Sequence, residues 1–540
     1  MADCSALITK FALDTRPQFT RAGKPKARTG CVTCRRRRVK CDEHKPQCTV
    51  CLKYQGYCGG YASKKTQPLS GQPQQRSILP KPVKKNTWAD LLKEPNYTSL
   101  VFSDQLEKDH FDYWLAFTRT TVLFTSDLLT QVIPQLSWND PVIKHAALAI
   151  GATALGGSTR KQRLLGKGRY NSDALVHYGK ALNLLYSSPM SSERTLVACL
   201  LFITFENLRG NKAGGLSHIN HGVRILDQCH PQVADPDPLL EKVMSSFQHL
   251  SLQAWSHGGM HPKETHARVP WCCRGRKLRY AVHEMPSDFE NLEMAHRWWN
   301  TVLHHVEHHA PLHSGFKVQG SAPLVTPKLP WEYGSPKSQE HIRSFARFID
   351  AWHLSFLRLA VKAEVEKETN IANYLKALSL RIHYLYLWGA IRCAGWTDME
   401  EIDRITPVFR DIVALSRELL AAQAARQPPT SSREIFTVED SPTWPLGSTC
   451  IMCTDPEVSN EAVQLFRQYP RRDGLWDTHA FLVMVEWMNE KFSVGQVSDG
   501  KRHIFDCDVV FQDHTVVLRK KLWDPEMSEW RLNDVRFSIL

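Results

Sequence analysis

The sequence lacks the features of a membrane or secreted protein. No apolar run among its 540 residues approaches the ~18 to 20 residues that a membrane-spanning helix requires. The longest uncharged apolar stretch, residues 146–157, is short and rich in Ala and Gly. Residues 1–11 lack a cationic segment followed by an apolar core, so we expect no secretory signal. The composition, with 42% hydrophobic and 23% charged residues, is typical of a soluble globular protein, and we expect no membrane partner.

Recognisable catalytic motifs are missing as well. There is no Gly-x-Ser-x-Gly elbow and no His-Glu-x-x-His zinc-protease helix. Residues 151–158 approach the spacing of a phosphate-binding loop, but Gly157 stands where the lysine is required. We therefore expect that the chain is not an enzyme.

Three further groups could carry chemistry, but each has a plainer structural interpretation. Four histidines could place metal ligands at i and i+4, yet a solvated helix face is the commoner explanation for His304, His305, His308 and His309. Cys450-x2-Cys453 lacks a second pair at zinc spacing, so we expect two partly buried thiols. Glu206 lies within an apolar run and is interpreted as a paired structural carboxylate, with a ligand-sensing role as the alternative.

Acidic residues are scarce at one end of the chain. Residues 1–86 contain 19 Lys and Arg against four acidic residues, a charge of +15, whereas residues 87–540 contain 49 basic and 51 acidic residues. Charge of one sign concentrated in this way indicates a segment that meets a polyanion. A solvated basic tail is the alternative.

Cysteine is also distributed unevenly, and its spacing indicates a metal site. Six of the 15 cysteines follow the pattern C-x2-C-x6-C-x6-C-x2-C-x6-C: Cys31, Cys34, Cys41, Cys48, Cys51 and Cys58. A dense, even cluster without a secretory signal favours metal ligation over disulfides. Because Zn²⁺ takes four ligands in a tetrahedron, six thiolates fill two sites only if two of them bridge both metals.

The cysteine pattern resembles that of the fungal binuclear zinc-cluster (Zn2Cys6) transcription factors. The resemblance implies two Zn²⁺ ions per chain, with the first cysteine of each half, Cys31 and Cys48, as the bridging ligands. Pro46 stands where family members carry a loop proline. A zinc-stapled unit that serves only folding is the alternative interpretation of the same cysteines.

A basic run between the second and third cysteines points to DNA. Residues 35–40 read Arg-Arg-Arg-Arg-Val-Lys, and arginine can pair with O6 and N7 of guanine in the major groove. The resemblance implies that the end of a short helix starting at Cys31 reaches a CGG-type triplet through Arg37 and Arg38. We assign phosphate contacts to Arg35, Arg36, Lys40 and Lys45.

Composition and hydrophobic periodicity divide the chain into four parts. We expect a disordered basic arm (1–30), the Zn2Cys6 domain (31–58) with two short helices, a flexible Pro/Lys/Gln linker (59–86) and a large all-α domain (87–540). Helices are predicted over 106–117, 142–155, 174–185, 196–205, 217–229, 289–309, 340–366, 372–392, 402–425, 458–468 and 478–492. Residues 427–445 are predicted to form a long loop. Asn139-Asp140-Pro141 is predicted to cap the second helix.

The C-terminal part is also similar to a known family, the fungal-specific regulatory domain found behind many zinc clusters. The similarity rests on four segments in order along the chain: residues 177–182, residues 200–206, His218-x3-Gly222-x3-Leu226 and residues 471–477. It implies a regulatory domain that contacts partners or senses state. No heptad register is present over residues 61–100, so the chain either dimerises through its helical body, binds DNA as a monomer or acts beside a partner.

These observations favour a nuclear, sequence-specific transcription regulator that binds double-stranded DNA and controls a specific metabolic or secondary-metabolite pathway. The alternative is a zinc-stapled scaffold whose helical body binds protein or a metabolite, with incidental DNA contact.

Overall fold

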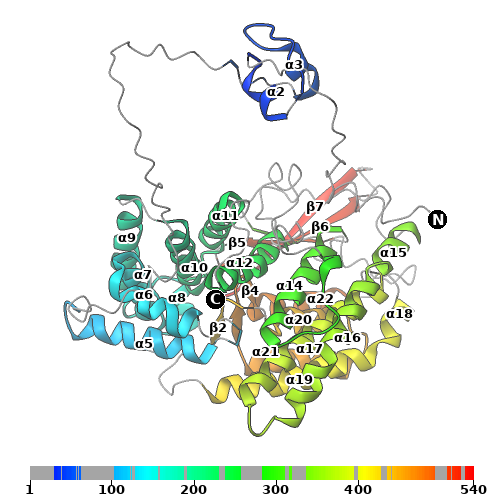
Figure 1. The fold of residues 1–540 in the computed structure, drawn as a ribbon. Helices are drawn as coiled ribbons and strands as arrows, with labels where there is room; N and C mark the ends of the chain where they lie inside the picture. Colours follow the sequence, from blue (N-terminus) through cyan, green and yellow to red (C-terminus); the bar gives the residue numbers. More distant parts are fainter. Residues whose placement is uncertain are drawn as a thin grey trace. The chain divides into compact units, whose positions relative to one another are not determined.

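The computed structural model of the chain divides into two compact units, residues 1–85 and residues 86–540 (Figure 1). The structure describes residues 29–61 and 102–540, and the statements below concern these residues. Gaps within those ranges fall at 38, 56–57, 59, 122, 125–127, 156–157, 188–190, 230–237, 257–281, 310–315, 319–335, 395–398, 427–433, 440, 493–506, 513 and 525–528. The predicted arm and linker therefore lie almost entirely outside the described residues.

The smaller unit is built around cysteines instead of an ordinary apolar core. It contains helix α2 (Val32–Arg37) and helix α3 (Thr49–Gln55). Each helix follows a cysteine whose carbonyl accepts the first helical hydrogen bond, from the Arg35 N–H at 3.0 Å in one case and from the Leu52 N–H at 3.2 Å in the other. The buried residues at its centre are Cys31, Cys34, Cys48, Cys51 and Cys58. A unit this small does not bury enough apolar surface to be stable alone, so a metal is the expected source of its stability.

The larger unit begins with a series of helices, of which five were predicted by the periodicity and four, over 128–132, 133–139, 160–164 and 238–256, were missed. They are α5 (Gln105–Thr121), the π-helix η1 (Leu128–Val132), α6 (Ile133–Asn139), α7 (Pro141–Ala154), α8 (Arg160–Leu164), α9 (Asn171–Ser187), α10 (Ser192–Leu208), α11 (Lys212–Cys229) and α12 (Pro238–Ser256). The predicted cap of α7 is confirmed, because the Asp140 carboxylate accepts the Val142 N–H at 2.9 Å. The predicted helix at 196–205 is apolar nearly all round in sequence, and the corresponding helix α10 is buried throughout 196–208.

The second half of this unit continues as η4 (Val282–Glu284), α14 (Leu292–His309), α15 (Pro336–Arg343), α16 (Ala346–Val365), α17 (Ile371–Arg392), α18 (Met399–Arg404), α19 (Thr406–Ala425), α20 (Thr443–Met452), α21 (Pro456–Gln468) and α22 (Thr478–Phe492). Two predicted helices are each divided in two. The predicted helix at 340–366 breaks at Ser344 and Phe345, which separate α15 from α16. The predicted helix at 402–425 breaks at Ile405 into α18 and α19. Pro407 lies in the first turn of α19, where proline favours the start of a new helix.

The prediction of an all-α body is wrong in detail, because two small sheets accompany the helices. One sheet has the order β1-β5-β6-β7, formed by Phe316–Val318, Cys507–Gln512, Thr515–Asp524 and Glu529–Ser538. Strands β6 and β7 are drawn in red in Figure 1. Their antiparallel register pairs Trp523 with Trp530, and Gln512 of β5 pairs with Thr515 of β6 across a two-residue connection. Two short β-branched and aromatic runs separated by a tight turn are a hairpin pattern that helical periodicity does not detect.

The second sheet corrects the predicted loop at 427–445. It has the order β2-β3-β4, formed by Ile435–Thr437, Arg471–Asp473 and Trp476–Asp477, and α20 also begins inside the predicted loop. A three-residue strand carries no readable alternation, and β2 exists because it pairs in parallel with β3 from another part of the chain.

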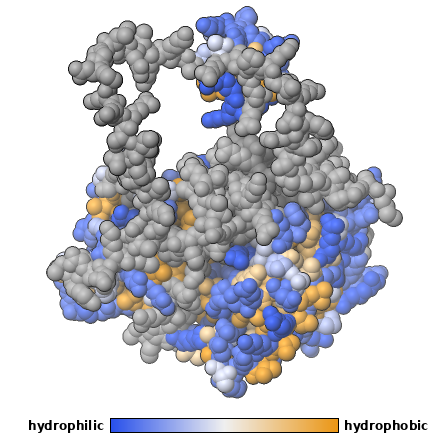
Figure 2. Space-filling model, in the orientation of Figure 1, coloured by the Kyte–Doolittle hydropathy of each residue, from blue (hydrophilic) through white to orange (hydrophobic). Residues whose placement is uncertain are grey.

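The body has one continuous apolar core, and its largest fully buried side chains include Trp114, Trp299 and Trp352. Leu106 of α5 is exposed, although the helical spacing of three and four residues relates it to the buried His110 and Trp114. On the face shown in Figure 2, apolar residues also reach the surface of the larger unit among polar ones. Within the described residues, no helix combines the length and apolar composition that a bilayer span requires.

Candidate metal centre and nucleic-acid interface

The six predicted cysteines come together in the smaller unit. The sulfur of Cys31 lies 3.7 Å from those of Cys48 and Cys51, and the sulfur of Cys34 lies 3.6 Å from the same two. A Zn–S bond of about 2.3 Å in a tetrahedron places neighbouring sulfurs about 3.8 Å apart, so the separations of Cys31 from Cys48 and Cys51, and of Cys34 from Cys48, suit sulfurs that share a metal. Cys34 and Cys51 are close together but do not belong to one four-thiol group.

The thiols form two overlapping groups of four. In each group all sulfur atoms lie within 4.8 Å of one another: Cys31, Cys34, Cys41 and Cys48 in the first, and Cys31, Cys48, Cys51 and Cys58 in the second. Cys31 and Cys48 belong to both groups. These are the two cysteines that the family resemblance assigns as bridging ligands.

Backbone N–H groups hold the sulfurs in place, and the pattern repeats in the two halves. The N–H of Cys34 donates to the sulfur of Cys31 at 3.3 Å, and the N–H of Cys51 donates to that of Cys48 at the same distance. The N–H groups of Cys31 and Cys48 donate at 3.4 Å to the sulfur of the cysteine ten residues onward. Donors aimed at sulfur favour the thiolate, which is the form that ligates a metal.

Burial works against thiolates unless a cation is present. It raises the pKa of Cys34 to about 12 and also raises the pKa of Cys48. At Cys41 burial acts in the same direction, but backbone hydrogen bonds from Cys31 and Glu43 outweigh it and lower the pKa to about 7. A divalent cation bound among the sulfurs would displace the remaining protons, which is how metal binding and folding become coupled. The soft donor set therefore fits zinc.

A comparison with known families identifies this unit. Residues 29–68 match the family model described as the fungal Zn(2)-Cys(6) binuclear cluster domain. The chain contains a Zn(2)-Cys(6) domain. This agrees with the resemblance seen in the cysteine spacing, and the cysteine cluster indicates zinc binding.

Relatives of the chain are transcription regulators. The aspercryptin biosynthesis cluster-specific transcription regulator atnN of Emericella nidulans is 28% identical over 226 residues, 38% of this chain and 35% of the relative. An uncharacterised transcriptional regulatory protein of Schizosaccharomyces pombe is 24% identical over 201 residues (36% and 34%), and the regulatory protein moc3 of the same yeast is 52% identical over 44 residues (8% and 9%).

The first two matches span about a third of each relative's length and are longer than the Zn(2)-Cys(6) domain, so they include part of the helical body. These relatives are regulators and not enzymes, in line with the expectation from the sequence. No solved structure matches the chain.

The Zn(2)-Cys(6) domain extends beyond the cysteines on both sides. The Tyr61 hydroxyl donates to the His44 carbonyl at 3.0 Å and lies 3.7 Å from the sulfur of Cys41. The Val32 N–H donates to the Gly60 carbonyl at 2.9 Å, and Thr29 donates to Glu43 at 2.6 Å. Thr29, Gly60 and Tyr61 fall in the predicted arm and linker, since nothing in the composition of those segments indicates contacts with the cluster.

The basic residues occupy one helix and the loop that follows it. Helix α2 carries no acidic residue in its first turn, and its last turn consists of Arg35, Arg36 and Arg37. Of these, Arg35 and Arg36 are exposed and Arg37 is half-buried. Lys40 and Lys45 are exposed, and the Lys45 ammonium lies 6.0 Å from the centre of the Tyr61 ring. Arg38, the second predicted base-reading residue, lies outside the described residues.

The other candidate groups belong to the core of the body. The prediction of a solvated face is wrong for His304 and His305, which are buried on α14, while the side chains of His308 and His309 lie outside the described residues. Cys450 and Cys453 are buried thiols, and Glu206 accepts a hydrogen bond from Asn211 at 2.9 Å. Glu206 is thus a buried carboxylate with a hydrogen-bond partner inside the body, and its structural role stays a prediction.

The segments that resemble the fungal regulatory domain meet in space. The Tyr178 hydroxyl, from α9, lies 2.9 Å from the Nε2 atom of His218 on α11. The Tyr178 ring stacks on Phe205 of α10 with ring centres 4.3 Å apart. Burial raises the pKa of Tyr178, and the hydrogen bond between its hydroxyl and Glu206 raises it further. Three of the four segments on which the family similarity rests, residues 177–182, 200–206 and 218–226, therefore contact one another in the folded body.

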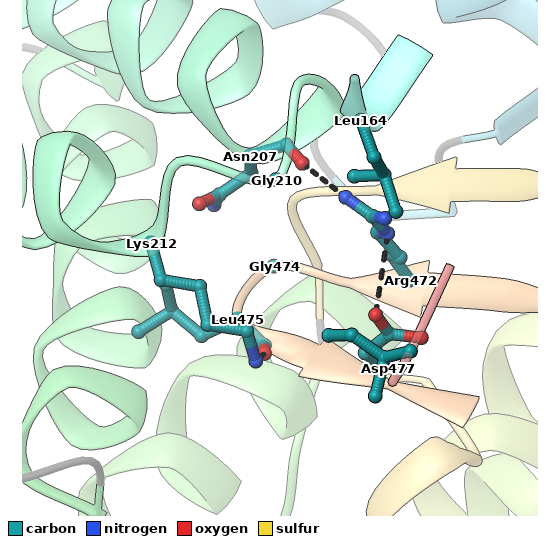
Figure 3. Close-up of a pocket in the computed structure, with 9 residues that line it drawn as sticks. Leu164, Asn207, Gly210, Lys212, Arg472, Gly474, Leu475 and Asp477 are labelled. Atoms are coloured by element: carbon teal, nitrogen blue, oxygen red, sulfur yellow. Dashed lines mark hydrogen bonds and ion pairs between the residues drawn. The ribbon is translucent and has the colours of Figure 1, made fainter. Parts of the chain in front are cut away.

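The fourth segment forms the β3–β4 hairpin, whose charged residues are buried. Arg472 donates to the Asn207 carbonyl at 2.7 Å and lies 3.6 Å from Asp477 (Figure 3). Lys212 donates to the Leu475 carbonyl at 2.7 Å beside them. The cavity between these residues, of about 10 Å³, holds about one water molecule and is far smaller than a metabolite pocket. The hairpin therefore has a structural role, because its residues form hydrogen bonds with α10 and α11.

Proposed function

We propose that this protein is a nuclear transcription regulator that reads DNA through its Zn(2)-Cys(6) domain. The observation that carries the proposal is the pair of overlapping four-thiol groups next to a helix whose last turn is entirely basic. A metal centre that only stabilised a fold would have no need of three consecutive arginines at the end of the helix beside it.

In the proposed centre, two Zn²⁺ ions share Cys31 and Cys48, and the remaining four thiolates complete the two tetrahedra. Six thiolates and two Zn²⁺ leave a charge of −2, which the surrounding Arg and Lys offset. The metal supplies the folding energy that the small apolar content of the unit cannot supply. The protein's own contribution is the set of backbone N–H donors that hold the sulfurs in position.

In the proposed DNA contact, α2 enters the major groove at a CGG-type triplet. Arg37 and Arg38 contact guanines, while Arg35, Arg36, Lys40 and Lys45 contact phosphates and fix the register. The exposed positions of Arg35, Arg36, Lys40 and Lys45 support the phosphate role. The phosphate contacts make affinity steeply dependent on salt.

A single triplet is too short to specify a genomic site, so a second contact is part of the proposal. Since no heptad register follows the cluster in the sequence, we assign contact with a second copy or with a transcription partner to the helical body. One relative is named for a biosynthetic gene cluster, and we propose a pathway-specific role for this chain too, in secondary metabolism.

In vitro selection from random DNA with the full-length chain tests this proposal. With zinc present we expect enrichment of a guanine-containing triplet, found once for a monomer or twice at fixed spacing for a dimer, and no enrichment after chelation. If zinc-loaded protein enriches no sequence, the proposal fails and the zinc-stapled scaffold becomes the better account.

A further inference from the structure

Three helices of the body bring a set of metal-ligating side chains together far from the cysteines in the sequence. Glu107 lies on α5, His145 on α7 and His177 on α9, and one ligand atom of each lies within 4.8 Å of the other two. Neither composition nor spacing reveals this group, because its members are separated by more than 30 residues and meet only through helix packing.

The close crossing of α5 and α7 positions the group. Gly151 of α7 faces the backbone of His110 on α5, and a Cβ atom built at Gly151 would lie 1.9 Å from the His110 carbonyl oxygen. Only glycine allows this approach. The crossing lies between one and two helical turns from His145 on α7 and three residues from Glu107 on α5, so it fixes the distance between these two ligands.

The two imidazoles face each other through the same ring atom. The Nδ1 atoms of His145 and His177 lie 3.1 Å apart, and the rings stack at 24° with centres 5.3 Å apart. Metal–nitrogen bonds of about 2.0 to 2.1 Å separate neighbouring ligand atoms by about 3.0 Å in an octahedron and about 3.4 Å in a tetrahedron. The observed separation falls between these two values.

One oxygen of the Glu107 carboxylate, Oε2, makes all of its hydrogen-bond and ion-pair contacts with described residues. The Ser103 N–H donates to Oε2 at 2.6 Å, the Ser103 hydroxyl donates at 3.1 Å, and Lys144 lies 3.8 Å from the same atom. Within the described part of the chain, every such contact of the side chain uses Oε2. This leaves Oε1 for a cation, and the Ser103 and Lys144 contacts are the kind of supporting interactions that orient a ligating carboxylate.

The electrostatic surroundings keep the imidazoles in the form that binds metals. Burial lowers the pKa of His177 to about 4, aided by neighbouring His145, and burial with Lys180 lowers the pKa of His145. Both rings are therefore neutral at physiological pH. Without a cation the two Nδ1 atoms are at hydrogen-bond distance, and with the proton of each ring on Nε2 both Nδ1 lone pairs can face a metal ion. Glu107 stays ionised, since the Ser103 N–H and Lys144 lower its pKa against the effect of burial.

We propose that Glu107, His145 and His177 form a binding site in the helical body for a divalent transition-metal ion, of which zinc is the representative. Two imidazoles and one carboxylate are the donor set that such ions accept, with a remaining position for water. His177 and Glu107 are buried while His145 is half-buried, so the site opens toward solvent on the side of α7. An ion there would tie α5, α7 and α9 together and make the packing of these helices depend on metal supply.

A neighbouring histidine supports a role beyond packing. His110 is 1% exposed, its ring centre lies 6.4 Å from that of His177, and neither of its nitrogens has a hydrogen-bond partner among the described residues. A buried imidazole without partners costs stability, and such groups are retained where they serve a site. Its ring meets that of His177 edge to face, so it lies next to the proposed centre without bonding to its ligands.

The proposal is tested by zinc content per full-length chain after dialysis against buffered zinc, measured by elemental analysis. We expect His145→Ala and Glu107→Gln to lose one equivalent of zinc relative to the wild-type chain. His353→Ala is the matched control, because His353 is also half-buried on a body helix. Its ring stacks on Tyr384 with centres 4.2 Å apart, and it belongs to no group of metal-ligating side chains among the described residues. It should lose none.

Zinc in the cysteine cluster does not confuse the result, since both variants retain all six cysteines and the difference from wild type is what counts. Circular dichroism checks that each variant is folded. Glu107→Gln keeps the size and shape of the side chain, so it decides the case if His145→Ala proves unstable. Equal zinc content in wild type and Glu107→Gln overturns the proposal, as does an equal loss in His353→Ala.

Discussion

The sulfur atoms of Cys31 and Cys48 lie 3.7 Å apart, and these two cysteines belong to both four-thiol groups of the Zn(2)-Cys(6) domain. They come from equivalent positions in two halves that repeat the same backbone-to-sulfur hydrogen bonds. Since each metal in the proposed centre needs sulfurs from both halves, neither half is expected to close around a metal alone. The domain should therefore gain or lose its structure as one unit.

Replacing Cys34 by Ser tests this coupling. The change removes one thiolate from the first group, and we expect loss of zinc and local unfolding of the cluster domain while the helical body keeps its circular dichroism spectrum. Elemental analysis and circular dichroism of the full chain measure the two effects. Cys453→Ser, a change at a buried thiol of the body, should leave zinc content unchanged. Collapse of the body in Cys34→Ser would contradict the independence of the two units.

Replacing Arg37 and Arg38 by Ala tests base reading. Each lost contact to guanine should cost ~1–3 kcal/mol of specific binding and relax the preference at one base, while zinc content stays intact. Binding titrations against the selected site and against single-base variants of it measure both effects.

Two comparison variants give this experiment its meaning. Arg35→Ala should weaken binding to all sequences alike and reduce the salt slope by about 1, as expected for a phosphate contact. Lys53→Ala removes an exposed charge from the other helix, α3, and should change specificity little. Unchanged target selection in the Arg37 and Arg38 double variant would rule out the proposed base contacts.

Local patterns predicted the parts of this molecule that depend on neighbouring residues. The cysteine spacing led to the metal centre, and Asp140-Pro141 marked the N-terminus of α7, which begins one residue before the predicted span. The C-terminal strands were missed because their stability comes from pairing between strands and not from a local period. The Glu107, His145 and His177 group was missed for the same reason, although His177 lay in a segment already singled out by its family resemblance.

Ion pairs between segments distant in the sequence were not predicted for the same reason. Arg160 donates at 2.5 Å to Glu434, 274 residues onward, and Arg163 pairs with the same carboxylate. Nothing in the local sequence of either segment indicates a partner so distant. These residues pair because they are buried in the fold, and a charge removed from water needs an opposite charge beside it.

The pairing of Glu434 predicts how the body responds to acid. Burial opposes its ionisation, but Arg472, Arg160 and Arg163 outweigh burial and lower its pKa from 4.5 to about 2. Because the folded pKa is below the unfolded one, this carboxylate stabilises the body above about pH 4.5, by about 3 kcal/mol, and loses that contribution as the pH falls toward 2. Urea unfolding followed by circular dichroism at several pH values measures the effect.

Glu434→Gln should lower the free energy of unfolding at neutral pH by about 3–5 kcal/mol, because buried arginines lose their counter-charge. It should also flatten the dependence of stability on pH in the acidic range. The control is Glu400→Gln, since Glu400 forms an exposed pair with Arg404 whose expected contribution is below about 1 kcal/mol. Equal acid sensitivity of Glu434→Gln and the wild-type chain would contradict the assignment.

Two helical glycines separate the effect of helix crossing from that of helix propensity. Gly151→Ala would push a Cβ atom into the His110 carbonyl, and since backbone cannot move aside as a flexible side chain does, we expect destabilisation of at least about 1–3 kcal/mol. Gly179 lies inside α9, and a Cβ atom built there meets no neighbouring atom. Gly179→Ala should therefore raise the free energy of unfolding by about 0.5–1 kcal/mol. Urea unfolding of both variants measures the difference, and Gly151→Ala should also release bound metal if the crossing positions Glu107 against His145. A Gly151→Ala variant as stable as Gly179→Ala would show that α5 and α7 can separate without cost.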